Sequence, residues 1–373
     1  MIISPELRNM TPYKPGKPIS EAQRELGLTH VIKLASNENP LGVSPLALEA
    51  MKVAIAQQFL YPDPTHFDLI TSLSQHWKIP RQNISIGNGS DEIIDLLTKI
   101  LCEPGQMMVT SQAAFAAYGV SAQANRVRAH FVPYTKDCKF DLPGIADFVE
   151  QAPIGQVKIV FIANPNNPTG TYNTKSEVEA FLERLGNRED VLLVFDEAYV
   201  EFARATDYVP AQTYLQKYTN LAVMRTFSKA YGIAGLRVGA LLASPEIIEI
   251  YNRVRKPFNC SAIAQVAAQA AIRDFQFIET TQQLTWKGLD YFYSSLEELG
   301  LPFFRSQGNF VMFDTLRDAR IVYEGLLREG IILRPLVNYG FPRHLRMSVG
   351  KNDENLAAIK ALRKVLAQIP ESR

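Results

Sequence analysis

The sequence predicts an α/β protein with a mostly parallel, mixed sheet in a large domain and a smaller α+β domain. From about residue 45 to residue 229, helical stretches alternate with short apolar runs. These runs are apolar nearly throughout, which is typical of strands buried on both faces of a sheet. After about residue 250, strands and helices are no longer evenly interleaved, which favours a second domain of another type.

The expected elements follow a regular order in the first two thirds of the chain. We expect helices at 45–59, 90–101, 115–125 and 175–185, and strands at 107–111, 158–165, 191–199 and 221–229. After an alanine-rich segment at 262–272, further helices are expected at 276–299 and 353–368. These patterns predict an N-terminal arm and part of the small domain at 1–40, a large domain at 41–255 and a small domain at 256–373.

The composition excludes several classes of protein. Lys and Arg number 39 and Asp and Glu 38, so no overall positive field exists to hold a nucleic acid. No apolar stretch approaches the roughly 18 residues needed to span a membrane. We therefore expect a soluble protein without nucleic-acid or membrane partners.

Cysteine and histidine usage also restricts the function. The three cysteines, Cys102, Cys138 and Cys260, are widely spaced and include no C-x-x-C pair, which disfavours a disulfide framework and a zinc ribbon. The five histidines never lie four residues apart, so we expect no metal site. A reducing cytoplasm suits this composition.

Polar residues end three of the expected strands, in the segments NPNNPTG (164–170), DEAY (196–199) and TFSK (226–229). In open α/β sheets, ligands bind at the carboxyl ends of the strands. The three segments are therefore expected to meet in one crevice.

Asp196 and Lys229 carry the most specific chemistry in this crevice. Asp196 ends an apolar strand, where a carboxylate needs a cationic partner such as a protonated pyridine nitrogen. A lysine that ends a buried strand is desolvated, which lowers its pKa and makes its amine available to form an imine with an aldehyde. Taken alone, however, Asp196 could equally cap the next helix.

Two further groups could bind anions or oxygens. Gly89, Ser90 and Asp91 begin a helix, where free backbone N–H groups attract anions, although an ordinary N-cap would look the same. Ser228 and Arg237 supply a hydroxyl and a guanidinium suited to one phosphate.

Asn167 and Tyr199 could both donate hydrogen bonds to a phenolate oxygen. As isolated features, such residues are more often part of turns or of the packed core.

Together these motifs resemble the pyridoxal-5′-phosphate (PLP) dependent aminotransferases of fold type I, over nearly the whole chain. The resemblance implies that Lys229 carries PLP as an imine and shuttles protons. It also implies that Asp196 contacts the pyridine nitrogen and that Asn167 and Tyr199 contact the 3′-oxygen. Phe115 would stack on the ring, and the residues implied around the phosphate are Gly89, Ser90, Asp91, Ser228 and Arg237.

The segments TPYKPGKP, LASNENPLG, YPDP, RKPFN and LRMSVG are similar to those of histidinol-phosphate aminotransferases. This resemblance implies a homodimer whose substrates are histidinol phosphate and glutamate or 2-oxoglutarate. Tyr61 would reach the cofactor phosphate of the partner subunit. The residues implied in the substrate pocket are Tyr13, Asn37, Arg334 and Arg346.

Other functions remain open at this level. An aromatic amino acid aminotransferase could use the same scaffold, and a PLP-dependent decarboxylase of a phosphorylated amino acid would have a similar sequence. A PLP-binding regulator is disfavoured because we find no helix-turn-helix extension. A nicotinamide enzyme is disfavoured because no G-x-G-x-x-G follows the first strand.

Overall fold

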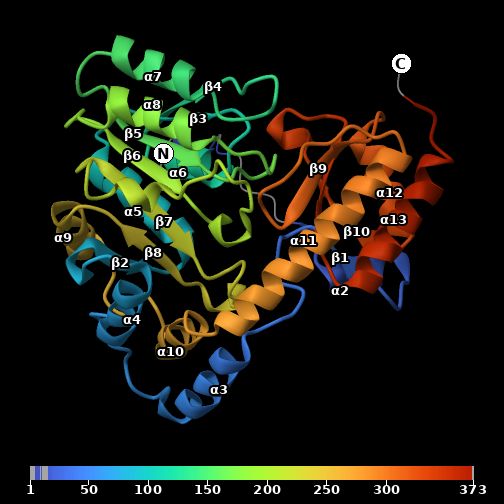
Figure 1. The fold of residues 1–373 in the computed structure, drawn as a ribbon, viewed down its shortest axis with the longest axis horizontal. Coiled ribbons are helices and arrows are strands. Elements are labelled where there is room, and N and C mark those ends of the chain that lie inside the picture. Colours follow the sequence, from blue (N-terminus) through green and yellow to red (C-terminus); the bar gives the residue numbers. More distant parts are fainter. Residues whose placement is uncertain (1–4, 9, 11–15, 372–373) are drawn as a thin grey trace.

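The computed structural model describes residues 5–8, 10 and 16–371, whose two largest hydrophobic cores belong to different parts of the molecule. The larger core surrounds a seven-stranded sheet, and the smaller one contains a three-stranded sheet and two long helices. The helix α11 (Phe275–Glu298) runs between the two parts (Figure 1). No helix in the described part of the chain is both long and apolar enough to cross a membrane.

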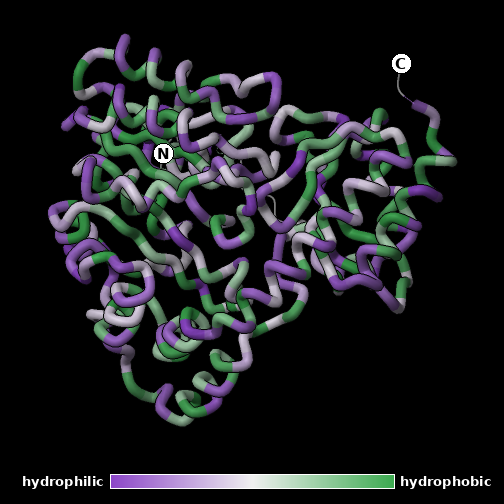
Figure 2. The backbone as a smooth tube through the Cα atoms, viewed as in Figure 1, coloured by the Kyte–Doolittle hydropathy of each residue, from purple (hydrophilic) through white to green (hydrophobic). Residues whose placement is uncertain are grey.

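The large sheet has the strand order β2-β8-β7-β6-β5-β3-β4. The strand β8 is antiparallel to both neighbours, and all other pairs are parallel, so the predicted mixed, mostly parallel sheet is confirmed. Figure 2 shows hydrophobic residues along these central strands. The strands are β2 (Ile84–Gly87), β3 (Met107–Ser111), β4 (Arg128–Val132), β5 (Val157–Ala163), β6 (Leu192–Asp196), β7 (Leu221–Thr226) and β8 (Gly239–Leu242).

Helices cover this sheet, and their ends follow local sequence signals. The helix α8 begins at a capping box, in which the Thr174 side chain accepts from the backbone of Glu177 and the Glu177 side chain accepts from that of Thr174. The helix α3 begins after the cap Ser44 with a proline at its first position. The helices are α3 (Pro45–Ala54), α4 (Phe67–Trp77), α5 (Gly89–Leu101), α6 (Ala117–Ala124), α7 (Leu142–Gln151), α8 (Lys175–Leu185), α9 (Pro245–Val254) and α10 (Ala262–Ala271).

The small domain combines residues from both ends of the chain. Its antiparallel sheet has the strand order β11-β12-β9. A second sheet consists of β1 and β10, which pair in parallel. Ile32 and Leu34 belong to the same core as residues of α11 to α13. The elements are α2 (Ile19–Leu26), β1 (Ile32–Lys33), β9 (Phe310–Asp314), α12 (Ala319–Arg328), β10 (Ile331–Ile332), β11 (Arg334–Pro335), β12 (His344–Ser348) and α13 (Asn352–Leu366). The short helix α1 (Pro5–Arg8) instead contacts α6 of the large domain.

The position of α10 bears on the predicted division at residue 255. This helix packs closely on α3, and its buried face, including Ala264, Ala267 and Ala268, belongs to the larger core. Small side chains allow such close approach of two helices. We therefore propose that the large domain extends through α10 and that the small domain begins within α11.

Candidate active site

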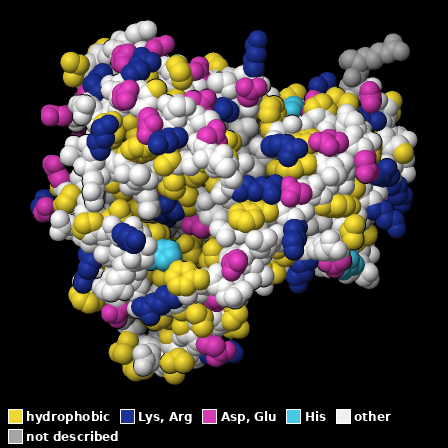
Figure 3. Space-filling view, viewed as in Figure 1, with side chains coloured by type: hydrophobic (Ala, Val, Ile, Leu, Met, Phe, Trp, Pro, Cys, Tyr) yellow, Lys and Arg dark blue, Asp and Glu magenta, His cyan; other side chains and the backbone are white. Residues whose placement is uncertain are grey.

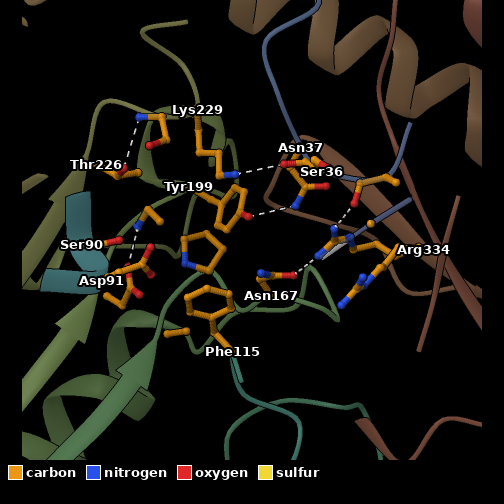
Figure 4. A pocket seen from close by; sticks show the side chains of 18 of the residues that line it. Ser36, Asn37, Ser90, Asp91, Phe115, Asn167, Tyr199, Thr226, Lys229 and Arg334 are labelled. Atoms are coloured by element: carbon orange, nitrogen blue, oxygen red, sulfur yellow. Dashed lines mark hydrogen bonds between the residues drawn. The ribbon is translucent and has the colours of Figure 1, made fainter. Parts of the chain in front are cut away.

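A cavity of about 390 Å³ lies at the carboxyl ends of β5, β6 and β7 and is closed on its other side by residues of the small domain (Figure 4). The three polar segments predicted to meet in one crevice all contribute to it. The predicted site residues that line it are Asn37, Ser90, Asp91, Phe115, Asn167, Asp196, Tyr199, Ser228, Lys229, Arg237, Arg334 and Arg346.

Asp196 is the last residue of β6, and its carboxylate has two partners in the protein. Its Oδ2 accepts a hydrogen bond from the Tyr118 hydroxyl at 2.7 Å, and its Oδ1 accepts one from the backbone N–H of Ala198 at 3.2 Å. Burial raises the pKa of Asp196 to about 6, although the bond from Tyr118 favours the charged form. The carboxylate is therefore fixed in position beside the cavity.

Lys229 follows β7 and extends its amine into the cavity. The Nζ atom donates to the Ser36 carbonyl oxygen at 3.1 Å (Figure 4). Burial, together with the nearby Arg346 guanidinium, lowers the pKa of Lys229 to about 8. A larger fraction of this amine is therefore neutral near physiological pH than is usual for lysine, as a nucleophile requires.

Asn37 lies beside Tyr199 and belongs to a short chain of hydrogen bonds. Its Nδ2 donates to the Tyr199 hydroxyl oxygen at 2.9 Å, and its Oδ1 accepts from the Ser348 hydroxyl at 2.6 Å. Asn37 is fully buried and has a positive φ of 55°. The small domain, through Ser348 on β12, therefore fixes the amide that contacts Tyr199.

One end of the cavity carries groups that are suited to an anion. The helix α5 begins there, and Arg237 reaches over its start to donate to Asp91 at 2.8 Å and to Ser228 at 3.3 Å. Gly89 does not line the cavity, but a Cβ atom on it would meet the Arg237 guanidinium at 2.4 Å. Glycine at this position thus allows the cation to lie close to the helix N–H groups.

The other end of the cavity holds Arg334 and Arg346. They are direct partners in the antiparallel pair β11–β12, so two cations lie side by side. Arg346 is buried and donates to the Asn167 side-chain oxygen and to the Ala35 carbonyl. Like charges directly opposite one another destabilise a sheet, and a bound anion would offset that repulsion.

Three more of the predicted residues differ in their relation to this cavity. Tyr61 does not line this cavity; it is 82% exposed and stacks on Phe258. Tyr13 lies outside the described residues. Phe115 lines the cavity and contacts Tyr118 edge-on, with ring centroids 5.9 Å apart.

Sequence reasoning missed Tyr118, Ser36 and Thr226, which all line the cavity. Ser36 adjoins Asn37, and Thr226 begins the segment TFSK, so both could have been predicted as neighbours of residues in these motifs. Tyr118 is three residues from Phe115 in a helical segment and carries no motif of its own. Only the spatial proximity of α6 and β6 reveals its contact with Asp196.

Comparisons with known proteins agree with this geometry. The family model "Aminotransferase class I and II" matches residues 29–362. The chain therefore belongs to the class I and II aminotransferases.

Its relatives narrow this class. The chain is 61% identical to the histidinol-phosphate aminotransferase of Bdellovibrio bacteriovorus, covering 99% of both chains. It is 42% identical to histidinol-phosphate aminotransferase 2 of Pseudomonas fluorescens, covering 98% of both. A solved structure of histidinol-phosphate aminotransferase from Sinorhizobium meliloti, in complex with pyridoxal-5′-phosphate, has a TM-score of 0.89 at 29% identity and covers 99% of this chain and 98% of that chain.

The enzyme is thus a PLP-dependent aminotransferase, and the residues of the cavity fit this cofactor. The desolvated amine of Lys229 suits an aldehyde, the buried carboxylate of Asp196 suits a pyridine nitrogen, and the start of α5 with Arg237 suits a phosphate. When bound, PLP supplies the aldehyde that reacts with amines and the ring that accepts electrons from the substrate.

Proposed function

We propose that this enzyme transfers the amino group of histidinol phosphate to 2-oxoglutarate, giving imidazole acetol phosphate and glutamate in histidine biosynthesis. The observation that carries the proposal is a cavity with two cationic ends on opposite sides of Lys229 (Figure 4). One end suits the cofactor phosphate. The other suits the phosphate of histidinol phosphate or a carboxylate of the amino donor. The names of the relatives support this substrate.

In this proposal Lys229 carries the cofactor and then moves a proton at the substrate carbon that bears the amine. Its lowered pKa allows the same amine to accept and return that proton near neutral pH. Asp196 keeps the pyridine nitrogen protonated, because a fixed carboxylate stabilises the cationic form.

Asn167 and Tyr199 are proposed to hold the 3′-oxygen of the cofactor. The Asn167 side-chain oxygen accepts from Arg346, so the amide nitrogen is turned to the other side and can donate. Asn37 donates to the Tyr199 oxygen and fixes its position. Phe115 is proposed to cover the ring face.

The cofactor phosphate is proposed to lie between the start of α5 and Arg237. The backbone N–H groups of Ser90 and Asp91 and the hydroxyl of Ser228 would donate to its oxygens. Asp91 already pairs with Arg237 and holds the guanidinium in place.

Arg334 and Arg346 are proposed to recognise the substrate anion. Their planar guanidinium groups match both phosphate and carboxylate oxygens through paired hydrogen bonds. Asn37 lies next to them in the cavity and would line the same pocket. The proposed contribution of Tyr13 concerns a residue outside the described part of the chain.

Replacing Arg334 by alanine should lower kcat/KM for histidinol phosphate roughly ten- to hundredfold, since a lost charge-assisted contact costs about 1.5–3 kcal/mol. Histidinol, which lacks the phosphate, should already be a poor substrate of the unaltered enzyme. Arg343→Ala is a suitable control, because Arg343 belongs to the same domain but pairs with Asp314. Unchanged kinetics of Arg334→Ala with histidinol phosphate would contradict this role.

The substrate itself is tested by comparing amino donors with 2-oxoglutarate as acceptor. We expect kcat/KM for histidinol phosphate to exceed the values for phenylalanine and tyrosine. A reversed order would identify an aromatic amino acid aminotransferase. Release of CO₂ from a phosphorylated amino acid would identify a decarboxylase.

We also propose that the enzyme is a cytoplasmic homodimer. Apolar side chains gather on the surface near α3 and the segment that follows it: Val53, Ile55, Phe59, Leu60 and Tyr61 are all at least 60% exposed. Figure 3 shows hydrophobic side chains at this end of the molecule. A contiguous apolar surface of this kind is typical of a protein interface. Tyr61 would then reach the cofactor phosphate of the partner subunit.

Mixing Tyr61→Phe with Lys229→Ala subunits tests this arrangement. If each site combines Lys229 of one chain with Tyr61 of the other, a mixed dimer contains one intact site. Random pairing should then give about a quarter of the unaltered activity when PLP is limiting. As a control, Tyr61→Phe subunits are mixed with subunits that carry both Tyr61→Phe and Lys229→Ala. No mixed dimer then contains an intact site, so no activity should be restored. A fully active monomer in sedimentation at assay concentration would rule out the shared site.

A further inference from the structure

We propose that Tyr118 is a positioning residue that acts on the cofactor ring nitrogen through Asp196. This inference rests on the proposed contact between Asp196 and that nitrogen. The Tyr118 hydroxyl is 2.7 Å from Asp196 Oδ2, and both residues line the cavity.

The ring of Tyr118 is fixed by its neighbours. The residue lies on α6 and is fully buried. Its ring stacks on Phe161 of β5, with centroids 4.8 Å apart and an angle of 3° between the planes. Phe115 contacts the Tyr118 ring edge-on, with ring centroids 5.9 Å apart. The hydroxyl can therefore reach Asp196 with little loss of conformational freedom.

The direction of the hydrogen bond follows from the two acidities. Burial and the charge of Asp196 raise the pKa of Tyr118 well above its usual value of 10.0, so the phenol keeps its proton. Tyr118 is thus the donor and the carboxylate is the acceptor. A hydrogen bond in this direction favours the ionised form of the carboxylate.

The hydrogen bond from Tyr118 matters because burial of Asp196 disfavours the ionised carboxylate that this bond stabilises. A carboxylate that leaves water is driven towards its neutral form, and a neutral Asp196 could not keep the pyridine nitrogen protonated. The second hydrogen bond that the protein gives to Asp196, from the Ala198 N–H, is longer, at 3.2 Å. Tyr118 therefore provides the shorter of the two bonds that hold the charge and the orientation of the carboxylate.

Tyr118→Phe removes this bond while keeping the aromatic ring that stacks on Phe161. The holoenzyme should be reconstituted with PLP labelled with ¹⁵N in the ring, and the ring-nitrogen resonance recorded. We expect it to move towards the unprotonated position. PLP should also dissociate roughly ten- to hundredfold faster, as for the loss of one charge-assisted hydrogen bond. The kcat for histidinol phosphate should fall more than KM changes.

Tyr231→Phe is a matched control. Tyr231 is also buried, and its hydroxyl also donates to a carboxylate, Glu201, but neither lines the cavity. This variant should leave the ring-nitrogen resonance unchanged. If the role of Tyr118 were purely structural, Tyr118→Phe would behave like Tyr231→Phe: thermal stability would fall and the resonance would not move.

The outcomes separate this inference from the proposed function. If Asp196→Asn leaves the resonance of the reconstituted enzyme unchanged, the proposed contact of Asp196 fails. If Asp196→Asn moves it and folded Tyr118→Phe does not, the role of Tyr118 is overturned and the aminotransferase function stands. If Tyr118→Phe does not fold, 3,5-difluorotyrosine at this position provides the test. Its more acidic hydroxyl should slow PLP dissociation, and unchanged or faster dissociation would overturn the inference.

Discussion

Lys229→Ala should abolish amino transfer while the chain retains some PLP. The loss should be about 10⁴-fold or more, at the upper end of what a positioned proton-transfer group contributes, because the same amine also holds the cofactor. Residual PLP binding is expected because Arg237, Ser228 and the start of α5 are unchanged. Single-turnover kinetics and the visible absorbance of the purified protein measure the two effects.

The unaltered enzyme should be yellow, and borohydride should fix the cofactor on Lys229. Incorporation of PLP into the apoenzyme should become faster as the pH rises, reach half of its maximal rate near pH 8 and level off above that pH, because the neutral amine reacts and its pKa is lowered to about 8. Lys99→Ala, which alters an exposed lysine on α5, should change none of these properties. Peptide mapping that places the reduced adduct on another lysine would remove the central assignment.

Asp196→Ala should lose both cofactor affinity and rate. Removing a fixed group that stabilises developing charge costs roughly 10²–10³ in kcat, and the Tyr118 hydroxyl would in addition lose its buried acceptor. Asp196→Asn keeps the volume but not the charge and should show nearly the same loss of rate. Titration of the apoenzyme with PLP and steady-state kinetics measure the two losses.

Asp147→Asn is the control for this experiment, because Asp147 pairs with Arg184 on the surface and does not line the cavity. It should leave PLP affinity and turnover unchanged. Full activity of Asp196→Asn would show that the ring nitrogen does not depend on a charged partner.

The large sheet could be predicted because its strands are apolar throughout and end in distinctive polar segments. β5, β6 and β7 begin and end close to the expected ranges. The short strands β2 and β4 were not expected. β4 lies at an edge of the sheet, and Arg128 and Phe131 on it are exposed, so it lacks the continuous apolar pattern.

Helix ends and domain membership were harder to predict. The expected helix 45–59 ends at Ala54 and continues as a 3₁₀ turn over Ile55–Gln57. The alanine-rich segment 262–272 forms the helix α10, but its composition does not say which core the helix joins. Its packing on α3 depends on a contact between segments far apart in the sequence.

The chemical roles of single residues were easier to predict than the hydrogen bonds that these residues form. The motifs indicated Asp196 and Lys229, but the bonds of Asp196 to Tyr118 and of Lys229 to the Ser36 carbonyl arise only when distant segments meet. Asn37 was expected in the substrate pocket, and its bonds to Tyr199 and Ser348 were not foreseen. Such contacts are set by tertiary packing, for which local sequence holds no signal.

The pairing of β1 with β10 separates the order of synthesis from the order of folding. A chain emerges from the ribosome with its N-terminal part first, and domains tend to fold as they emerge. The strands of the large sheet are complete by Leu242, but Ile32 must wait for Ile331 before it can form its ladder. Segment 32–34 thus leaves the ribosome early and remains unpaired while the entire large domain is being made. The small domain, which closes over the cavity, is therefore the last part of the enzyme to assemble.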